Sequence, residues 1–365
     1  MRAALIGLLL LLLGTGRALE VRVLLATAPV LEVALPGPHA VWGPAGPLFS
    51  RSNGATYRLR LEGGRVWLEG RALGDRASFV PQGGGGFVLD GRSYPGFLRV
   101  FAAEGRLLAV NVVDLEAYLE GVLPGEMPAS FPLEALKAQA VIARTYALER
   151  LGSHPTYDLC ASASCQVYLG RGRAGPAQRA AIRATRGRIL AYRGRPVRAV
   201  YHADSGGETA SSYEVWGKVF PYLVPRPDPY TRARGWRYAP PADRIARALA
   251  GLGLDLGTVR GFRVLGRTES GRIGRLEVRG SRGAAVLAVP QVTRFLRALG
   301  LPSTLARLEG PRVFVGQGSG HGVGLSQWGA RGLARHGFDY RAILGHYYPG
   351  TVLAPYVVKA SRPAP

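Results

Sequence analysis

The hydrophobic pattern changes its period partway along the chain, and this change limits the fold more than any other feature. Residues 57–62 alternate apolar and charged side chains, which is typical of a half-buried strand. Gly63 and Gly64 then favour a hairpin turn into a second strand at residues 66–68. Beyond Asp114 the pattern becomes helical. We therefore predict an α+β protein, with a β-rich N-terminal part followed by a mixed α/β part.

The longest predicted helix covers residues 132–151. Pro132 stands in its first turn, Gly152 follows its end, and its many alanines suit close packing against a neighbour. The 365 residues contain no fixed-period repeat and no low-complexity linker, so we divide the chain by character alone. Further helices are predicted at 115–123, 176–186, 326–336 and 340–347, and the proposed parts are 1–18, 19–111, 112–355 and a tail at 356–365.

Residues 1–18 have the composition of a secretory signal peptide. Arg2 gives a basic start, residues 3–13 are apolar, and residues 16–18 form a small-x-small cleavage pattern. The apolar run is shorter than a bilayer span requires. We therefore expect export to the cell envelope or the medium, with an uncleaved N-terminal anchor as the alternative.

The chain is strongly basic. It has 47 lysines and arginines against 24 acidic residues, which gives a net charge of +23 at pH 7. A positive field of this size favours polyanionic surroundings. Because the leader directs the chain out of the cytoplasm, we expect an anionic envelope rather than nucleic acid as its partner.

Four stretches, in this order, carry a family resemblance. They are LEAYLEGVLPGEMP at 115–128, EALKAQAVIARTY at 134–146, AVYHADSGGET at 199–209, and GSGHGVGLSQWGA at 318–330 followed by HYYPGT at 346–351. Together they closely resemble the stage II sporulation protein D family, which includes amidase enhancers. Characterised members are peptidoglycan lytic transglycosylases that act on glycan strands stripped of stem peptides. The resemblance implies that residues 112–355 are a catalytic region that encloses a glycan-binding groove.

Glu126 is the candidate catalytic residue. We expect it in a rigid Pro-Gly-Glu-Met-Pro turn between two helices, where apolar neighbours desolvate the carboxyl group. Desolvation raises the pKa of a carboxyl group and lets it act as an acid near neutral pH. The alternative is an acidic residue favourably placed before a helix. The family has its catalytic glutamate at this position of the motif.

Lys137 and Arg144 are candidate substrate-binding residues. They lie seven positions apart on the predicted helix, so they project from nearly the same face. Two aligned cations suit the lactyl carboxylate or the hydroxyls of a muramic acid strand. A charged stripe on a solvated helix is the alternative explanation. Both positions match basic positions of the family's motif.

The glycine-rich stretches supply the other candidates. His202 and Ser205 are three apart on one segment, which argues against a hydrolase triad. Glycines instead allow the backbone to approach a sugar chain closely. The predicted substrate contacts from these stretches are Ser205, Gly206, Gly207, His321, Gln327 and Trp328, and a capped and packed helix start is the alternative for the last two.

Cys160 and Cys165 have three possible states. Some family members bind zinc here with a histidine immediately before the second cysteine, where this chain has Ser164. His154, Cys160 and Cys165 would then be three zinc ligands with no obvious fourth. We favour a disulfide over zinc, and zinc over free thiols, and therefore expect no metal cofactor.

The sequence favours a lytic transglycosylase that cleaves the β-1,4 bond between N-acetylmuramic acid and N-acetylglucosamine. Ordinary glycosidases use two carboxylates. One suffices here, because the substrate supplies its own nucleophile, so Glu126 would serve as both acid and base. The rival is a non-catalytic glycan-binding enhancer of a cell-wall amidase. A zinc-dependent amidase and a DNA-binding protein are more remote. The expected partners are peptidoglycan glycan strands and a cell-wall amidase.

Overall fold

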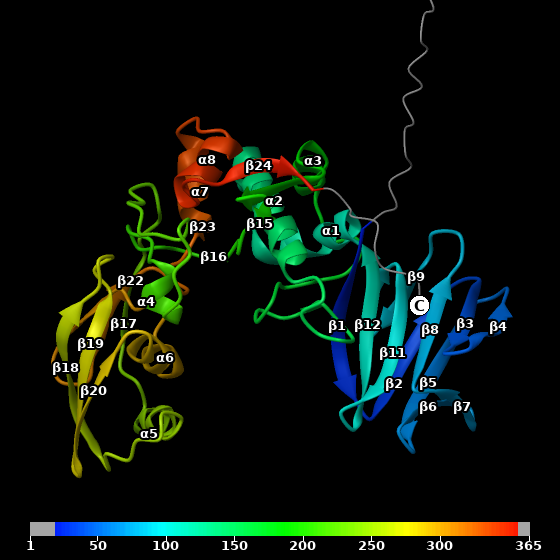
Figure 1. Ribbon diagram of the computed structural model, residues 1–365, viewed down its shortest axis with the longest axis horizontal. Helices are drawn as coiled ribbons and strands as arrows, with labels where there is room; N and C mark the ends of the chain where they lie inside the picture. The colour runs from blue at the N-terminus through cyan, green and yellow to red at the C-terminus, as the bar shows by residue number, and fades with distance from the viewer. Residues whose placement is uncertain (1–18, 357–365) are drawn as a thin grey trace, which may run out of the picture.

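The computed structural model describes residues 19–356. It contains 24 strands in several sheets and 8 helices, which confirms the α+β prediction with a β-rich N-terminal part. The predicted signal peptide and residues 357–365 of the tail lie outside the described residues. Along the longest axis a β-rich part, a helical part and a second β-rich part follow one another (Figure 1). None of the helices within residues 19–356 is long and apolar enough to cross a lipid bilayer.

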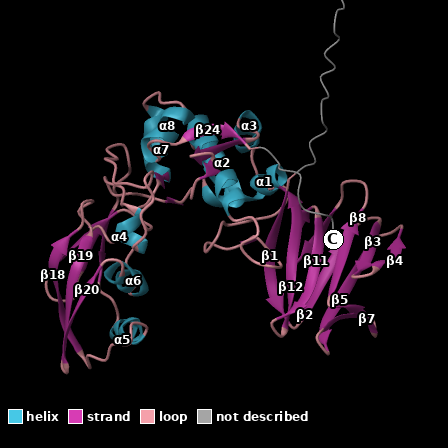
Figure 2. Ribbon diagram, in the orientation of Figure 1, coloured by secondary structure: helices cyan, strands magenta, loops and turns pink. Residues whose placement is uncertain are grey.

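Two sheets form the N-terminal part (Figure 2). In strand β5 (Ala55–Glu62), Tyr57 and Leu59 are buried while Arg58 and Arg60 are exposed, so the predicted alternation is present. One sheet has the order β13 (Leu159–Cys160), β1 (Glu20–Ala28), β12 (Arg106–Asp114), β11 (Phe97–Ala103), β8 (Arg76–Pro81), β3 (His39–Gly43), β4 (Gly46–Arg51). The other has the order β10 (Arg92–Pro95), β9 (Gly86–Leu89), β2 (Val30–Leu35), β5, β6 (Arg65–Leu68), β7 (Arg71–Gly74).

The helical part is built around α2 (Leu133–Glu149), which contacts four other helices. Its alanines are buried, and their small side chains allow these neighbours to pack closely. Buried residues of the helices and of the N-terminal sheets form one continuous hydrophobic cluster. The four neighbours are α1 (Leu115–Glu126), α3 (Pro176–Ala184), α7 (Gln327–Arg335) and α8 (Tyr340–Tyr347). Two small sheets complete this part: β15 (Arg195–Pro196), β14 (Arg188–Tyr192) and β24 (Val352–Pro355), and β16 (Tyr201–His202) with β23 (Leu325–Ser326).

The chain leaves the helical part after β16 and returns to it at β23. Most of the segment between these two strands forms a separate lobe. We call residues 231–324 the lobe. It has its own hydrophobic cluster, and its entering and leaving strands pair antiparallel, with Gly235 opposite Gln317. Short α4 (Ser212–Trp216) precedes it. Its elements are β17 (Gly235–Tyr238), α5 (Ala242–Ala250), β18 (Val259–Arg267), β19 (Ile273–Gly280), β20 (Gly283–Ala288), α6 (Gln291–Ala298), β21 (Ala306–Leu308) and β22 (Phe314–Gln317).

Candidate active site

Glu126 is the last residue of α1, and this corrects the expected turn. The helix continues through Pro124 and Gly125, and Met127 N donates to Leu123 O at 2.9 Å. A proline removes one helical hydrogen bond without always ending the helix. A Cβ at Gly125 would lie 2.8 Å from Val167 O, so the glycine allows the segment after the disulfide to approach α1. The helix end thus presents Glu126 to that segment.

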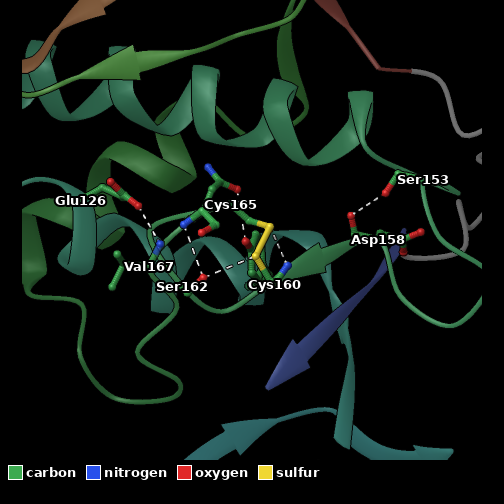
Figure 3. Close-up of a disulfide and its surroundings, with 10 residues drawn as sticks. Glu126, Ser153, Asp158, Cys160, Ser162, Cys165 and Val167 are labelled. Atoms are coloured by element: carbon green, nitrogen blue, oxygen red, sulfur yellow. Dashed lines mark hydrogen bonds between the residues drawn. A yellow bond between two sulfur atoms is a disulfide. The ribbon is translucent and has the colours of Figure 1, made fainter. Parts of the chain in front are cut away.

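The Glu126 carboxylate is partly exposed and accepts a backbone hydrogen bond. Val167 N donates to its Oε1 at 2.7 Å (Figure 3). Burial raises the pKa of Glu126, and the Val167 N–H and the Tyr201 hydroxyl lower it by smaller amounts. Because burial dominates, the net effect favours the protonated form. This is the direction that a general acid needs near neutral pH.

Tyr201 and Val167 are functional candidates that sequence reasoning missed. Tyr201 is on β16, and its hydroxyl accepts from Gln166 Nε2 at 3.4 Å. Burial raises the pKa of Tyr201 well above its usual value, so the phenol stays neutral beside Glu126. Tyr201 lies within the third motif stretch, residues 199–209, and its place in that motif is the sequence signal that could have identified it. Val167 acts through its backbone N–H, and no side-chain pattern could have revealed it.

The predicted contacts on α7 lie beside Glu126. Gln327 Nε2 donates to Glu126 O at 2.9 Å, which connects the start of α7 to the end of α1. Ser326 caps α7 by accepting from Gly329 N at 3.2 Å. Trp328 is half-buried, and its ring packs edge-on against Phe131 with centroids 5.2 Å apart. The capped helix start, the alternative explanation for these two residues, is present, and it places Gln327 against the backbone carbonyl of Glu126.

Arg144 is not a surface cation, and this is a correction. Its side chain is completely buried, with Nε 2.7 Å from Glu116 Oε1 and Nη2 2.8 Å from Glu116 Oε2. Nη1 donates to Arg188 O at 3.0 Å. The seven-residue spacing from Lys137 predicts one shared face of the helix directed at substrate, but α2 is surrounded by other helices and Arg144 is buried among them. Arg144 therefore joins α1, α2 and β14 and is not available to a glycan.

Lys137 is partly exposed and has a partner. Its Nζ lies 2.6 Å from Glu134 Oε1, one helical turn earlier, and 5.8 Å from the centre of the Tyr340 ring. Glu134 Oε2 accepts from Tyr340 N at 2.9 Å. The pair therefore lies where α2 meets α8. Lys137 remains partly exposed, and its contact with substrate stays a prediction.

The Ser205-Gly206-Gly207 segment lies largely inside the protein. Ser205 is buried, and its hydroxyl donates to Asp228 Oδ2 at 2.6 Å. Asp228 also accepts from the Tyr347 hydroxyl at 2.9 Å. Gly206 is buried as well, while Gly207 is partly exposed. The expected sugar contact by Ser205 and Gly206 is therefore corrected, because both pack behind the start of α7.

His321 lies against the rings of His202 and Trp216. Its Nδ1 accepts from Val323 N at 3.0 Å. Its ring lies near those of His202 and Trp216, with centroids 5.5 and 5.3 Å away. Burial, with Arg297 as the next cause, lowers the pKa of His321 to about 3, so the imidazole is neutral. Its contacts are therefore with the Val323 backbone and two neighbouring rings, and the substrate contact expected of His321 stays a prediction.

Cys160 and Cys165 form a disulfide, the state that we favoured. Their Cα atoms are 5.4 Å apart. His154 stacks on Tyr157 with centroids 4.1 Å apart, and its Nδ1 lies 3.0 Å from Thr156 Oγ1. Within residues 19–356 no three His, Cys, Asp or Glu side chains are placed to hold a metal ion together. Two oxidised sulfurs cannot be thiolate ligands, so the donors present do not fit the zinc site of some family members.

Comparison with known proteins matches both the helical part and the lobe. Residues 103–192 match a family described as stage II sporulation protein, and residues 231–324 match a domain of unknown function. An uncharacterised protein of Brachyspira hyodysenteriae is 31% identical over 280 residues, which cover 74% of this chain and 75% of that protein.

Two Bacillus subtilis proteins are also similar. The amidase enhancer is 28% identical over 368 residues, covering 84% of this chain, and the chain spans about half of that protein, 51%. Stage II sporulation protein D is 28% identical over 271 residues, covering 67% of this chain and 76% of that protein. Glu126, Val167 and the disulfide all lie within the segment that matches the stage II sporulation family.

Proposed function

Because this chain belongs to the stage II sporulation protein D family, we propose that it remodels the cell wall as an exported peptidoglycan lytic transglycosylase. The proposed substrate is the glycan strand, cleaved between N-acetylmuramic acid and N-acetylglucosamine. The leader composition supports export to the envelope. The net charge of +23 supports retention on an anionic wall rather than binding to nucleic acid.

The environment of Glu126 is the observation that carries the proposal. Its carboxylate is partly exposed, its pKa is raised by burial, and Val167 N donates a hydrogen bond to it. Three other carboxylates have fixed structural partners: Glu116 pairs with Arg144, Glu134 with Lys137, and Asp228 with Ser205 and Tyr347. Of these four carboxylates, Glu126 is therefore the best suited to move a proton to and from a sugar.

The proposed reaction needs only this one proton carrier. Protonated Glu126 gives its proton to the glycosidic oxygen, and the bond from the muramic C1 to that oxygen breaks. The carboxylate then takes the proton of the muramic C6 hydroxyl, whose oxygen bonds to C1 and closes an anhydro ring. Glu126 ends protonated as it began, and no water is consumed. Tyr201 stays neutral throughout and orients the carboxylate.

Product chemistry tests the proposal directly. Peptide-free glycan strands and strands with intact stem peptides are each incubated with the purified chain, and products are weighed by mass spectrometry. We expect muramic ends that are one water molecule lighter than a hydrolysis product and resistant to borohydride reduction. Reducible muramic ends would identify a hydrolase instead. No cleavage of either strand would exclude the enzyme.

A second candidate is a non-catalytic enhancer that binds glycan and activates a cell-wall amidase. Similarity to the amidase enhancer over 84% of this chain favours it. The two candidates differ in their need for Glu126. An enhancer should stimulate amidase release of stem peptides equally well as wild type and as Glu126→Gln, whereas transglycosylase products require the carboxyl group.

A further inference from the structure

Two arginines lie near the Trp328 ring, beside the candidate active site. The guanidinium carbon of Arg232 lies 4.8 Å from the ring centre, and that of Arg331 lies 4.9 Å from it. Arg331 also lies 5.5 Å from the centre of the Phe131 ring. Arg232 comes from the first residues of the lobe and Arg331 from α7. We call Arg232, Arg331 and Trp328 the arginine–tryptophan cluster.

The two cations lack an acidic partner. Within residues 19–356 neither guanidinium forms an ion pair. A third cation, Arg335, follows Arg331 by one helical turn on α7. Partial burial and the charges of Arg335 and Arg232 lower the pKa of Arg331. Positive groups are thus held together with no carboxylate of the described chain to offset them, an arrangement that an anionic ligand would stabilise.

The cluster is fixed in position relative to Glu126. Trp328 follows Gln327, whose side chain donates to Glu126 O at 2.9 Å. On the lobe side, Thr231 Oγ1 donates to Asp204 Oδ1 at 2.7 Å, immediately before Arg232. A Cβ at Gly332 would collide with the Tyr230 carbonyl, so this glycine allows the entry to the lobe to lie against α7. These contacts, which come from both sides, bring Arg232 and Arg331 to the same aromatic ring.

We propose that the arginine–tryptophan cluster binds a carboxylate of the glycan strand, the free lactyl group of an N-acetylmuramic acid residue next to the scissile bond. The inference rests on the proposed function and identifies the residues that select its substrate. A guanidinium presents paired donors that match a carboxylate, and the Trp328 ring keeps the planes of both oriented. The sequence assigned this task to Lys137 and Arg144, but Arg144 is buried on Glu116 and Lys137 is paired with Glu134.

This assignment implies selection against stem peptides. In a strand that carries a peptide, the lactyl carboxylate is an amide, which is neutral and offers one acceptor instead of two charged oxygens. Placing that amide against two guanidinium groups forfeits the charge-assisted bonds. The cluster should therefore bind peptide-free muramic acid more tightly than its amide-linked form.

Binding to a matched pair of ligands tests the inference. The probes are a tetrasaccharide of alternating N-acetylglucosamine and N-acetylmuramic acid with free lactyl carboxylates, and the same tetrasaccharide with those carboxylates converted to primary amides. Titration calorimetry uses the whole chain as Glu126→Gln, so that the ligand is not cleaved. We expect the acid form to bind at least roughly tenfold more tightly than the amide form.

The Arg232→Gln/Arg331→Gln double variant should lose this preference while it binds the amide form as before. Arg260→Gln/Arg275→Gln removes the same charge from exposed lobe positions and should keep the preference. If the glutamine variant unfolds at a lower temperature, Arg232→Lys/Arg331→Lys keeps the charge and should keep part of the preference.

Two outcomes overturn the inference and leave the proposed transglycosylase function untouched. One is equal affinity of the parent protein for both probes, and the other is a preference for the acid form that survives in the double glutamine variant. No binding of either probe contradicts the proposed function as well.

Discussion

At the scale of single residues, burial governs the proton affinity of Glu126. Its pKa is raised in the folded chain, so the folded state binds this proton more tightly than the unfolded state. Glu126 therefore favours the folded state at pH values below the pKa that it has in the unfolded chain. This advantage is lost as the pH rises through the higher pKa that it has in the folded chain. At pH 7 the buried charge opposes folding.

Glu126→Gln should therefore unfold at a higher temperature than wild type at pH 7, with the difference disappearing below about pH 4, where both side chains are neutral. The amide can still accept the Val167 N–H bond. Thermal unfolding followed by circular dichroism measures this. Glu120→Gln, at an exposed position of the same helix, serves as the control. A Glu126→Gln protein less stable than wild type at pH 7 would contradict the burial argument.

Arg144 and Glu116 form a buried ion pair with two close contacts. Removing one partner leaves a buried charge without compensation, so Arg144→Ala should lower the free energy of unfolding by about 3–5 kcal/mol. Urea denaturation measures it. The free energy of unfolding should fall less in the double variant Glu116→Leu/Arg144→Met than in Arg144→Ala. An Arg144→Ala protein of normal stability that no longer binds glycan would restore the role that the sequence suggested.

At the scale of elements, the disulfide loop connects directly to the carboxylate. Cys165 is followed by Gln166, which contacts Tyr201, and by Val167, which bonds Glu126 (Figure 3). Cys160 ends β13, which pairs with β1 of the large sheet, with Leu24 opposite Cys160. The disulfide thus connects the loop that holds the active site to the rigid N-terminal part.

Cys160→Ser/Cys165→Ser should cost about 2 kcal/mol of stability, because the closed loop is short. It should also raise the pKa of Glu126 further, since a looser Val167 N–H lowers it less. Urea denaturation and carbon-detected NMR titration of Glu126 measure the two effects. Ser162→Ala, inside the same loop, is the control. If the pKa of Glu126 is the same in the cysteine-free chain as in wild type, the loop holds its position without the disulfide, and the prediction is contradicted.

Sequence reasoning located elements where proline and glycine mark their ends. The helix predicted at residues 132–151 corresponds closely to α2, because Pro132 and Gly152 act locally, and the helix predicted at 340–347 corresponds to α8. The end of α1 was wrong, because a tertiary contact at Gly125 keeps Pro124 within the helix. Arg144 was misplaced because its burial depends on helices distant in sequence. Glu126 was identified by its motif, but no local pattern could indicate that Val167 N would bond to it.

At the scale of the whole molecule, the buried apolar side chains of the described residues form two separate hydrophobic clusters. One joins the N-terminal sheets to the helices, and the other lies within the lobe. No local signal marks the lobe in the sequence, because its two ends are far apart along the chain and meet through the pairing of β17 with β22. An insertion whose ends meet and whose core is its own has the features of an independent domain.

Residues 231–324 expressed alone should therefore fold cooperatively, while residues 19–111 alone should not, because their core is completed by helices. Far-UV circular dichroism with urea denaturation measures both fragments. A cooperative transition for residues 19–111, or its absence for the lobe, would contradict this division.

The central claim is that one carboxyl group, Glu126, acts as both acid and base in cutting the glycan strand. The most direct test compares wild type with Glu126→Gln on peptide-free strands and counts anhydromuramic ends by mass spectrometry, with Glu120→Gln as the matched control. We predict that the Glu126→Gln protein binds strands normally and forms these ends about 10²–10⁴-fold more slowly, while Glu120→Gln is unaffected. A folded Glu126→Gln protein that forms anhydromuramic ends at the wild-type rate would contradict the account.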